Sequence, residues 1–205
     1  MRDRTVFIVD DDEAVRQALG FLLRTAGYSV ECLTSAEEFL RRYNPRCPGC
    51  LILDIRMPDM TGLELQQALN ARSWRIPVIL VTGHGTVPVA IAALRAGAFE
   101  FLEKPLEEDA LLDSVKRALN EDAAIRRQAA ARGELAARAA RLTPREREIM
   151  RLVAMGEQNK MIARRLGISF RTVEIHRTRV MEKMQARSLS DLVRMVIALD
   201  ESASS

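Results

Sequence analysis

The sequence has few cysteines and no long apolar run. Its 205 residues include three cysteines, and an odd number of cysteines argues against a disulfide framework. The apolar runs fall well short of the ~18 residues that a membrane-spanning helix needs. The charged start Met1-Arg2-Asp3-Arg4, with only a short apolar run after it, does not suit a secretory signal. We therefore expect a cytoplasmic protein with no membrane partner.

The composition is that of a folded chain with two differently charged parts. Hydrophobic residues make up 48% of the sequence and charged residues 29%, which argues against global disorder. Residues 1–120 carry 14 basic and 17 acidic side chains, a net charge of −3, whereas residues 142–205 carry 12 and 8, a net charge of +4. This asymmetry predicts two units with different partners. The partner of the second, basic unit is predicted to be a polyanion such as nucleic acid.

The first 120 residues alternate short apolar runs with amphipathic segments. The runs predict strands and the segments predict helices, in five successive β–α units. Apolar strands that alternate with helices form a parallel sheet covered on both faces, so we expect an α/β fold with a doubly wound five-stranded parallel sheet. The expected strands are 6–9, 28–33, 51–53, 78–81 and 99–102, and the expected helices are 13–26, 35–43, 62–70, 87–96 and one that begins near 107.

The segment 121–141 predicts a helical linker. It lacks proline and is rich in alanine, arginine and glutamate, which favour helix, so it should continue the helix that begins near 107. A flexible charged tether is the alternative. We therefore predict a first domain over 1–120 and a second that begins at 142.

Residues 142–199 predict an all-α domain of four short helices. Thr143-Pro144-Arg145-Glu146 has the pattern of a helix start, with threonine as N-cap and the glutamate completing a capping box. Gly167 ends a second helix, and Ser169 can cap a third. The last of these helices should end near 199, followed by a tail over 200–205 whose residues Ser202-Ala203-Ser204-Ser205 should be frayed.

Charged and hydroxyl side chains follow four of the predicted strands. Asp10-Asp11-Asp12 follow the first strand, Asp54 the third, Thr82 the fourth and Lys104 the fifth. These groups should converge, because ligands of doubly wound sheets bind beyond the carboxyl ends of the strands. Packed carboxylates repel unless a cation joins them, and Mg²⁺ prefers such oxygen ligands. A carboxylate beside Mg²⁺ can attack phosphorus to give an acyl phosphate. Of the three consecutive aspartates, Asp12 fits the N-cap of helix 13–26 better than a place in this site.

These strand-end motifs resemble the signature of response-regulator receiver domains. The resemblance implies that Asp54 is the phosphoacceptor and that Asp10 and Asp11 bind Mg²⁺ together with Asp54 and the backbone carbonyl of Arg56. It also implies that Thr82 and Lys104 contact the phosphoryl group, that Phe101 is the switch aromatic, and that the Lys104-Pro105 bond is cis. The matching segments are Ile8-Val9-Asp10-Asp11, Leu53-Asp54-Ile55-Arg56-Met57-Pro58-Asp59-Met60-Thr61-Gly62, Val81-Thr82-Gly83 and Lys104-Pro105.

The predicted helix 170–184 has the features of a DNA-recognition helix. It follows the helix 158–166 and a tight turn, which is the arrangement of a helix-turn-helix. One face carries Phe170, Val173, Val180 and Met184 and is predicted to be core. On the outer side, Glu174 and Ile175 are suited to reading bases, and long cations on the flanks are suited to phosphates. The expected contacts to double-stranded DNA are Arg171, Thr172, Glu174, Ile175, Arg177, Thr178, Arg179 and Lys183.

The second domain resembles the LuxR-type DNA-binding domain, on Leu142-Thr143-Pro144-Arg145-Glu146-Arg147-Glu148, Lys160-Met161-Ile162-Ala163, Leu166-Gly167-Ile168-Ser169 and Thr172-Val173-Glu174-Ile175-His176. With a receiver in front, the whole chain is similar to the FixJ/NarL subclass of response regulators and leans toward its nitrogen-fixation regulators. The resemblance implies a sensor histidine kinase as phosphodonor and a homodimer formed on phosphorylation through the receiver's fourth helix and fifth strand. It also implies transcription activation with RNA polymerase at promoter DNA, and no enzyme activity beyond the receiver's own phosphoryl transfer and dephosphorylation.

Two other functions stay open at this point. One is a DNA-binding regulator whose receiver only mediates protein contacts. The other is an aspartate-nucleophile phosphatase, although Asp54-Ile55-Arg56 lacks the second acid of that class. The Cys47-Pro48-Gly49-Cys50 segment imitates a redox motif, but it precedes a strand instead of opening a helix, so we expect no redox role.

Overall fold

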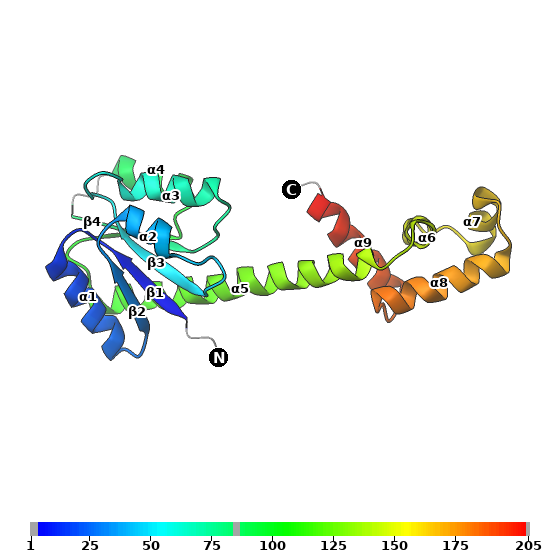
Figure 1. Cartoon of the computed structure of the whole chain (residues 1–205), viewed down its shortest axis with the longest axis horizontal. Helices are drawn as coiled ribbons and strands as arrows, with labels where there is room; N and C mark the ends of the chain where they lie inside the picture. Colours follow the sequence, from blue (N-terminus) through cyan, green and yellow to red (C-terminus); the bar gives the residue numbers. More distant parts are fainter. Residues whose placement is uncertain (1–3, 84–86, 204–205) are drawn as a thin grey trace. The chain divides into compact units, whose positions relative to one another are not determined.

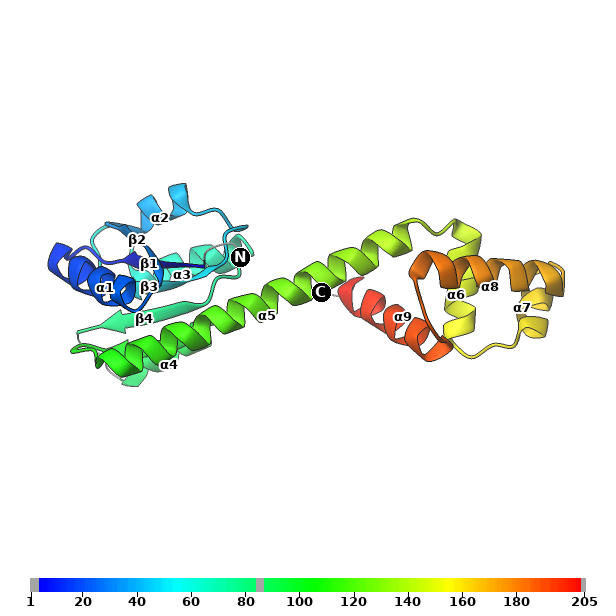
Figure 2. The ribbon, with the colours of Figure 1, turned by 90° about the horizontal axis from the view of Figure 1, so that it is seen from below.

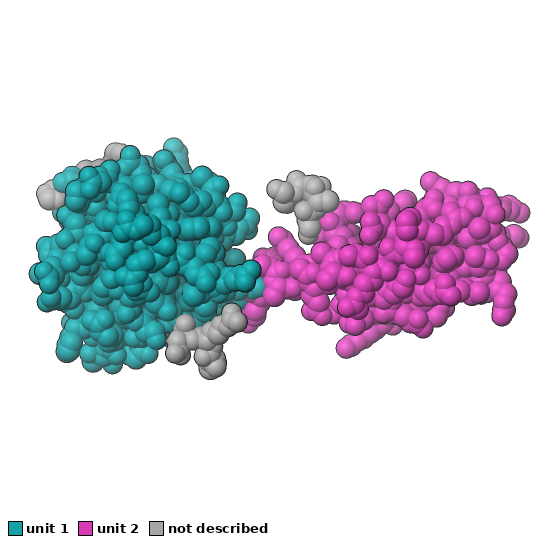
Figure 3. All heavy atoms as spheres, in the orientation of Figure 1, with its two compact units in different colours: residues 1–126 teal, residues 127–205 magenta. Residues whose placement is uncertain are grey.

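The structure is a computed structural model of the chain, and it describes residues 4–83 and 87–203. The chain divides into two compact units, residues 1–126 and 127–205 (Figure 3). No helix within the described residues is both long and apolar enough to cross a membrane.

The first unit confirms the predicted doubly wound fold. Its five strands form one all-parallel sheet in the order β2-β1-β3-β4-β5 (Figure 1). Strand and helix ends differ from the predicted ones by one or two residues, which is the usual fraying of element boundaries. The elements are β1 Thr5–Val9, α1 Glu13–Thr25, β2 Ser29–Leu33, α2 Ala36–Arg42, β3 Gly49–Asp54, α3 Gly62–Ala71, β4 Val78–Thr82, α4 Val87–Arg95, β5 Glu100–Glu103 and α5 Glu108–Ala140.

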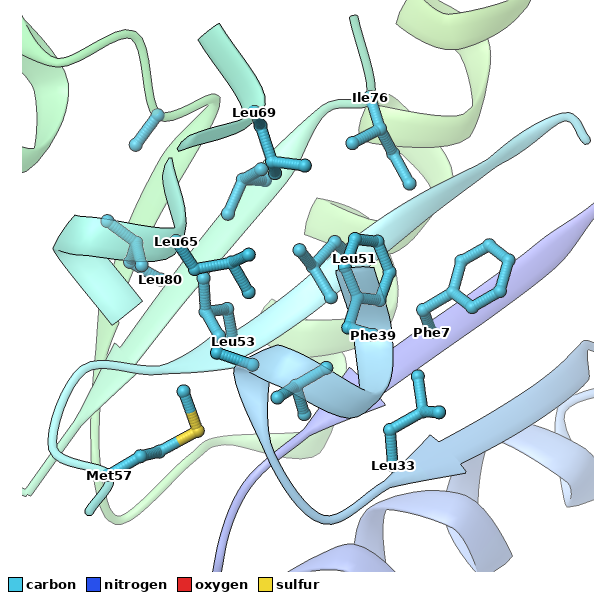
Figure 4. Close-up of a cluster of buried hydrophobic side chains, with 14 of the residues drawn as sticks. Phe7, Leu33, Phe39, Leu51, Leu53, Met57, Leu65, Leu69, Ile76 and Leu80 are labelled. Atoms are coloured by element: carbon cyan, nitrogen blue, oxygen red, sulfur yellow. The ribbon is translucent and has the colours of Figure 1, made fainter. Parts of the chain in front are cut away.

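The central strands alternate their side chains between two apolar cores. In β3, Leu51 and Leu53 face a core that α2, α3 and α4 cover, and Cys50 and Ile52 face a second core beneath α1 and α5. Figure 4 shows the first of these cores, with Phe39 of α2 and Leu65 of α3 beside the strand residues. Because strand side chains alternate with a period of two, continuous apolar strands are stable only when helices cover both faces.

The helix α5 is one continuous helix of 33 residues, as expected for the linker segment. Its first half is anchored to the sheet, since Leu111 and Val115 are fully buried in the second core. Beyond Asp122 the alanine- and arginine-rich sequence continues the helix with few buried side chains. Helix propensity therefore sustains the later turns, where packing against the sheet no longer does.

A buried ion pair fastens α5 to the start of β3. Asp122 is 1% exposed, accepts a hydrogen bond from the Gly49 N–H at 3.0 Å and pairs with Arg126 at 2.8 Å. Arg126 in turn donates to the carbonyl oxygens of Pro45 and Cys47 at 3.0 and 2.5 Å. Gly49 is required at this position, because a Cβ atom there would lie 2.1 Å from the carbonyl oxygen of Thr5. We call this arrangement the Asp122 clasp.

The Asp122 clasp holds the backbone of the Cys47-Pro48-Gly49-Cys50 segment through its hydrogen bonds to Cys47 and Gly49. Both cysteines are free thiols; Cys47 is exposed and Cys50 is buried in β3. Burial raises the pKa of the Cys50 thiol to about 12, so it stays protonated near neutral pH.

The described residues of the second unit form helices, and side-chain caps mark where α6 and α8 begin. They are α6 Pro144–Ala154, α7 Asn159–Leu166, α8 Phe170–Met184 and α9 Leu189–Ala203. The Thr143–Glu146 capping box, the left-handed Gly167 (φ 64°) at the end of α7 and the Ser169 cap of α8 are all present, as predicted. Together the four helices enclose one apolar core, to which α5 adds Leu135 and Ala139.

Two expectations for this unit are wrong. Phe170, which was placed on the core face of α8, is 50% exposed, because it is the first residue of the helix and lies beyond the edge of the core. The last helix, α9, does not end near 199 but continues to Ala203, into the segment 202–205 that was expected to fray, since no glycine or proline follows Leu189 to end it. Residues 204–205 lie outside the described residues.

The Asp122 clasp generates a stability prediction. Replacing Asp122 by alanine leaves Arg126 and the Gly49 N–H without their buried partner, so the free energy of unfolding of the first unit should fall by about 3 kcal/mol. Trp74, the one tryptophan of the chain, packs partly buried against the first core and reports this unit in a urea titration. Asp113→Ala is the control, because Asp113 is 65% exposed and pairs with Arg117 on the same helix. Equal losses in the two variants would contradict the assignment, since an exposed pair contributes less than about 1 kcal/mol.

Candidate functional site

The predicted strand-end residues lie along the carboxyl edge of the sheet. The chain winds to β2 on one side of β1 and then to β3 on the other, so the switch point lies between β1 and β3. At such a point the connections diverge and leave a crevice for a ligand. Asp10 directly follows β1 and Asp54 is the last residue of β3, so both carboxylates flank the switch point.

Three of the predicted residues make direct contact. The Lys104 ammonium group lies 2.9 Å from Asp10 Oδ2 and 2.8 Å from Asp54 Oδ1. Both carboxylates are nearly buried, at 3% and 6% exposed, whereas the lysine side chain is 26% exposed. The remaining oxygens bond to the local backbone: the N–H of Asp12 donates to Asp10 Oδ1 at 2.9 Å, and the N–H of Arg56 donates to Asp54 Oδ2 at 2.6 Å.

Burial and pairing have opposite effects on the acidity of this cluster. Burial raises the pKa of Asp54, and the ammonium group of Lys104 offsets only part of that rise. Burial alone would lower the pKa of Lys104, but its hydrogen bonds to Asp54 and Asp10 outweigh that effect and raise it. Lys104 is therefore a permanent cation held between two carboxylates.

The structure separates the roles of the three consecutive aspartates. Asp12 is the N-cap of α1 and accepts hydrogen bonds from the N–H groups of Ala14 and Val15, as predicted. Asp11 is exposed, next to Asp10. With Asp12 committed to the helix, Asp10 and Asp11 remain as the carboxylates of this run that could join Asp54 around a metal ion.

The oxygen donors beside Lys104 are of the kind that a hard divalent cation prefers, although in the described residues the third carboxylate is not gathered with the other two. Two buried carboxylates already converge on one cationic position, which Lys104 fills, and their three charges leave a net charge of −1. Among the described residues no three His, Cys, Asp or Glu side chains are gathered closely enough to hold a metal ion. Asp10, Asp54, the neighbouring Asp11 and the carbonyl of Arg56 would supply the oxygen ligands that Mg²⁺ prefers.

The other predicted receiver residues lie on β4 and β5 or directly after them. Thr82 is 2% exposed at the end of β4, and its carbonyl oxygen accepts a hydrogen bond from the N–H of Lys104 at 2.8 Å. The Lys104-Pro105 bond is cis, as expected. Phe101 lies in β5, opposite Leu80, and packs half-buried against the first core.

Arg16 is a residue of this site that the sequence did not reveal. Its guanidinium donates to the carbonyl oxygen of Asp10 at 2.7 Å and so holds the loop that carries the acids. Arg16 lies on α1, six residues after Asp10, and this spacing alone does not predict the contact.

Comparison with known proteins assigns both units. The model of the response regulator receiver domain matches residues 6–116, and the model of the luxR family of bacterial regulatory proteins matches residues 140–196. The chain belongs to the response regulators of the FixJ/NarL subclass.

Individual relatives are similar over nearly the whole chain. The transcriptional regulatory protein FixJ of Azorhizobium caulinodans is 47% identical, covering 94% of this chain and 91% of that protein. The response regulator protein TodT of Pseudomonas putida is 42% identical over 98% of this chain and 90% of its own. Among solved structures, response regulator StyR has a TM-score of 0.86 and 45% identity, covering 95% of this chain and 98% of that one.

The DNA-binding unit of this response regulator presents most of the predicted contact residues on α8. Arg171, Glu174, Ile175, Thr178 and Arg179 are exposed, and Thr172 and Arg177 are partly exposed. Ile175 is 46% exposed although it is aliphatic. Three core residues of α8, Val173, Val180 and Met184, are buried, so the helix has the two-faced character that was predicted.

Two of the predicted phosphate contacts also make contacts within the domain. The Lys183 ammonium group lies 2.6 Å from Glu146 Oε2, which is 2% exposed, so Lys183 joins α8 to α6, while its side chain stays 34% exposed and its contact with DNA stays a prediction. Arg177 donates to Asn159 Oδ1 at 2.7 Å and links α8 to the start of α7. Its charge still lies beside the outer arc of α8.

A groove of about 580 Å³ between α7 and α8 adds residues that the sequence did not single out. Its lining includes Gln158, Asn159 and Lys160 from the start of α7, opposite Glu174 and Thr178 of α8. The first helix of a helix-turn-helix crosses the DNA backbone, so an exposed lysine at its start is suited to a phosphate. Lys160 belongs to the Lys160-Met161-Ile162-Ala163 segment of the LuxR-type resemblance, and this segment is the sequence signal that could have identified it as a phosphate contact.

The Glu146–Lys183 pair generates a pH prediction. Burial alone would raise the pKa of Glu146, but hydrogen bonds from Lys183 and Thr143 outweigh it and lower the pKa. A lowered carboxyl pKa stabilises the fold above the unfolded value of about 4.3, and this contribution is lost as the pH falls through the folded value. Glu146→Gln should therefore lower the free energy of unfolding by about 1–2 kcal/mol at pH 7 and by much less near pH 3.

Scanning calorimetry of the full chain at both pH values measures this difference. Glu148→Gln is the control on the same helix, because Glu148 is 50% exposed and pairs with Arg145. A loss for Glu146→Gln that is the same at pH 7 and pH 3 would show that the charge of Glu146 does not stabilise the fold.

Proposed function

We propose that this response regulator is a phosphorylation-activated transcription regulator that accepts a phosphoryl group on Asp54 from a sensor histidine kinase. The observation that carries the proposal is the pairing of Asp54 and Asp10 through Lys104 at the switch point of the sheet. The family's other features agree with it, and the site has the nucleophile, the cation and the neighbouring hydroxyl that the reaction needs.

In the proposed reaction a carboxylate oxygen of Asp54 attacks phosphorus, and the kinase histidine leaves. Lys104 neutralises charge on the phosphoryl oxygens, and the Thr82 hydroxyl donates a hydrogen bond to one of them. Asp10, Asp11, Asp54 and the carbonyl of Arg56 would hold Mg²⁺, which supplies further charge neutralisation at the phosphoryl oxygens. Phe101 is proposed as the aromatic that responds to phosphorylation.

We further propose that phosphorylation leads to a homodimer through α4 and β5. Ile91 and Leu94 of α4 support this, because both are apolar and 45% and 53% exposed.

We assign the receiver to residues 1–120, the linker to 121–141 and the DNA-binding domain to 142–199. The dimer would act in the cytoplasm on double-stranded promoter DNA as an activator, with RNA polymerase as its partner.

Nitrogen-fixation genes are one candidate set of targets, because of the similarity to FixJ. TodT is nearly as similar, so a different set is the alternative, and genomic footprinting of the phosphorylated protein distinguishes them. The phosphatase alternative lacks support, since Arg56 stands where that class has its second acid. A receiver that mediates only protein contacts would have no use for a buried carboxylate paired with lysine.

The phosphoacceptor assignment is tested with acetyl phosphate and Mg²⁺. Wild-type protein should gain one phosphoryl group in an intact-mass measurement, and Asp54→Asn should gain none because the amide is not a nucleophile. Asp59→Asn is the control, since Asp59 is exposed in the following loop and its φ of 68° suits asparagine. Phosphorylation of Asp54→Asn at the wild-type rate would contradict the assignment, and continuous turnover of acetyl phosphate by wild type would favour a phosphatase.

A second test separates base reading from phosphate contact on α8. Ile175→Ala should weaken binding to the specific site by about 1–3 kcal/mol and leave random DNA nearly unaffected, because Ile175 offers apolar contact to a base. Arg171→Ala should weaken binding to both duplexes and reduce the slope of log affinity against log salt by about one. Binding titrations at several salt concentrations measure both effects. The reverse pattern would mean that α8 lies in the groove in a different orientation.

A further inference from the structure

A cavity of about 460 Å³ opens in the first unit at the edge of the sheet opposite the Lys104 cluster. It lies beside Val78, the first residue of β4, whereas Thr82, the last residue of β4, lies at the carboxyl edge. Figure 2 shows α5 running beside β4, and Glu121 and Ile125 of α5 border the cavity on that side. Its volume is typical of small-molecule sites, and the functions proposed above do not use it. We call it the β4 cavity.

Two amide side chains one helical turn apart on α3 line the β4 cavity. Gln66 Nε2 and Asn70 Nδ2 both donate to the carbonyl oxygen of Ala96, at 3.3 and 2.8 Å. This shared acceptor fixes how both amides are turned, because the reverse orientation would place an amide oxygen against the carbonyl oxygen. Each amide oxygen is therefore turned away from Ala96.

The oxygens of these two amides lack a hydrogen-bond donor. Gln66 is 3% exposed, and its Oε1 atom is buried without a partner. Asn70 is exposed, and its Oδ1 atom accepts no hydrogen bond from any residue within 4–83 and 87–203. A buried acceptor without a donor destabilises the fold, and a donor on a bound molecule would remove that cost.

Aromatic rings form other parts of the cavity wall. Trp74 lies between α3 and β4, and Phe99 lies just before β5, where its N–H donates to the carbonyl oxygen of Val78 at 2.8 Å. Both side chains are only partly buried against the apolar cores, so each has ring surface left for a ligand. Flat heteroaromatic rings, nucleobases among them, bind by stacking on such side chains.

The charged side chains at the cavity balance each other. Arg75 and Glu121 line it, both are exposed, and neither forms a hydrogen bond or an ion pair with another residue that the structure describes. Their opposite charges leave no net charge that would attract an anion or a cation. The cavity therefore favours a neutral ligand.

We propose that the β4 cavity binds a neutral, flat heteroaromatic ring that carries an amino group, of the kind found in adenosine. The ring would stack on Trp74, and the two N–H groups of its amino substituent would donate to Gln66 Oε1 and Asn70 Oδ1. An amino group matches the site better than a carbonyl group, because each amide nitrogen already donates to Ala96 whereas each amide oxygen lacks a donor. The proposal is independent of phosphoryl transfer at Asp54, since the cavity lies at the other edge of the sheet.

Binding of adenosine to the full chain tests the proposal. Isothermal titration calorimetry measures the affinity, and the fluorescence of Trp74, the one tryptophan of the chain, reports whether the ligand reaches the cavity. Purine riboside is the matched ligand, because it is adenosine without the amino group. Gln66→Met and Asn70→Ala are the site variants. Gln67→Met is the control, because Gln67 is exposed on the same helix and does not line the cavity.

We expect wild type to bind adenosine with a change in Trp74 fluorescence, and to bind purine riboside at least tenfold more weakly. Gln66→Met and Asn70→Ala should each weaken adenosine binding at least fivefold and leave purine riboside binding nearly unchanged, because each variant removes an acceptor that only the amino group uses. Gln67→Met should match wild type with both ligands. Asn70→Ala keeps the test decisive if Gln66→Met does not fold, since Asn70 is exposed.

Each of three results would overturn the proposal. If adenosine at millimolar concentration produces neither heat nor a fluorescence change, the cavity does not bind this class of ligand. Equal affinities for adenosine and purine riboside would show that the two amides do not recognise an amino group. Adenosine binding that is unchanged in both site variants, or that leaves Trp74 fluorescence unchanged, would place the ligand elsewhere on the protein.

Discussion

The Lys104 ammonium group between Asp10 and Asp54 is the interaction on which the receiver site depends. Two carboxylates that are almost fully buried would repel each other and take up protons if nothing neutralised them. The ammonium group lies within 2.9 Å of both, and its positive charge offsets part of the repulsion between them. Two carboxylates and one ammonium group leave the cluster with a net charge of −1, and burial still raises the pKa of Asp54. A further cation at this position would therefore be attracted to the cluster.

The topology of the sheet is what brings these charges together. Asp10 and Lys104 are 94 residues apart and Asp54 and Lys104 are 50 apart, and each side chain is delivered by the carboxyl end of a different strand. At the opposite edge the Asp122 clasp joins the start of β3 to α5. The strand that carries Asp54 is therefore held at its end by the ion pair with Lys104, at its start by the hydrogen bond from the Gly49 N–H to Asp122, and in its middle by apolar packing on both faces.

The features that follow local rules could be predicted from the sequence. Apolar runs ending in acids gave the strands and the site edge, and Thr143, Ser169 and Gly167 marked helix ends because capping depends on residues within one turn. The features that could not be predicted from the sequence depend on residues far apart in the chain. Glu146 lies 37 residues from Lys183, and Gly49 lies 73 residues from Asp122, so no periodicity or spacing reveals either contact. Phe170 failed for a related reason, because a helical wheel gives direction but not where the core ends along the axis.

The cations of the DNA-binding unit divide into those that build the domain and those that remain available to partners. Lys183 forms an ion pair with Glu146 and Arg177 donates a hydrogen bond to the amide oxygen of Asn159, which fixes α8 against α6 and α7. A recognition helix must be held this firmly, since base contacts depend on side chains within a fraction of an ångström of their targets. Exposed arginines remain on each of the four helices, for example Arg151 on α6, Arg164 on α7, Arg171 on α8 and Arg194 on α9. A net charge of +4 in this part of the chain is too small to identify nucleic acid as the partner, so the assignment to DNA depends on which side chains α8 presents and not on the total charge.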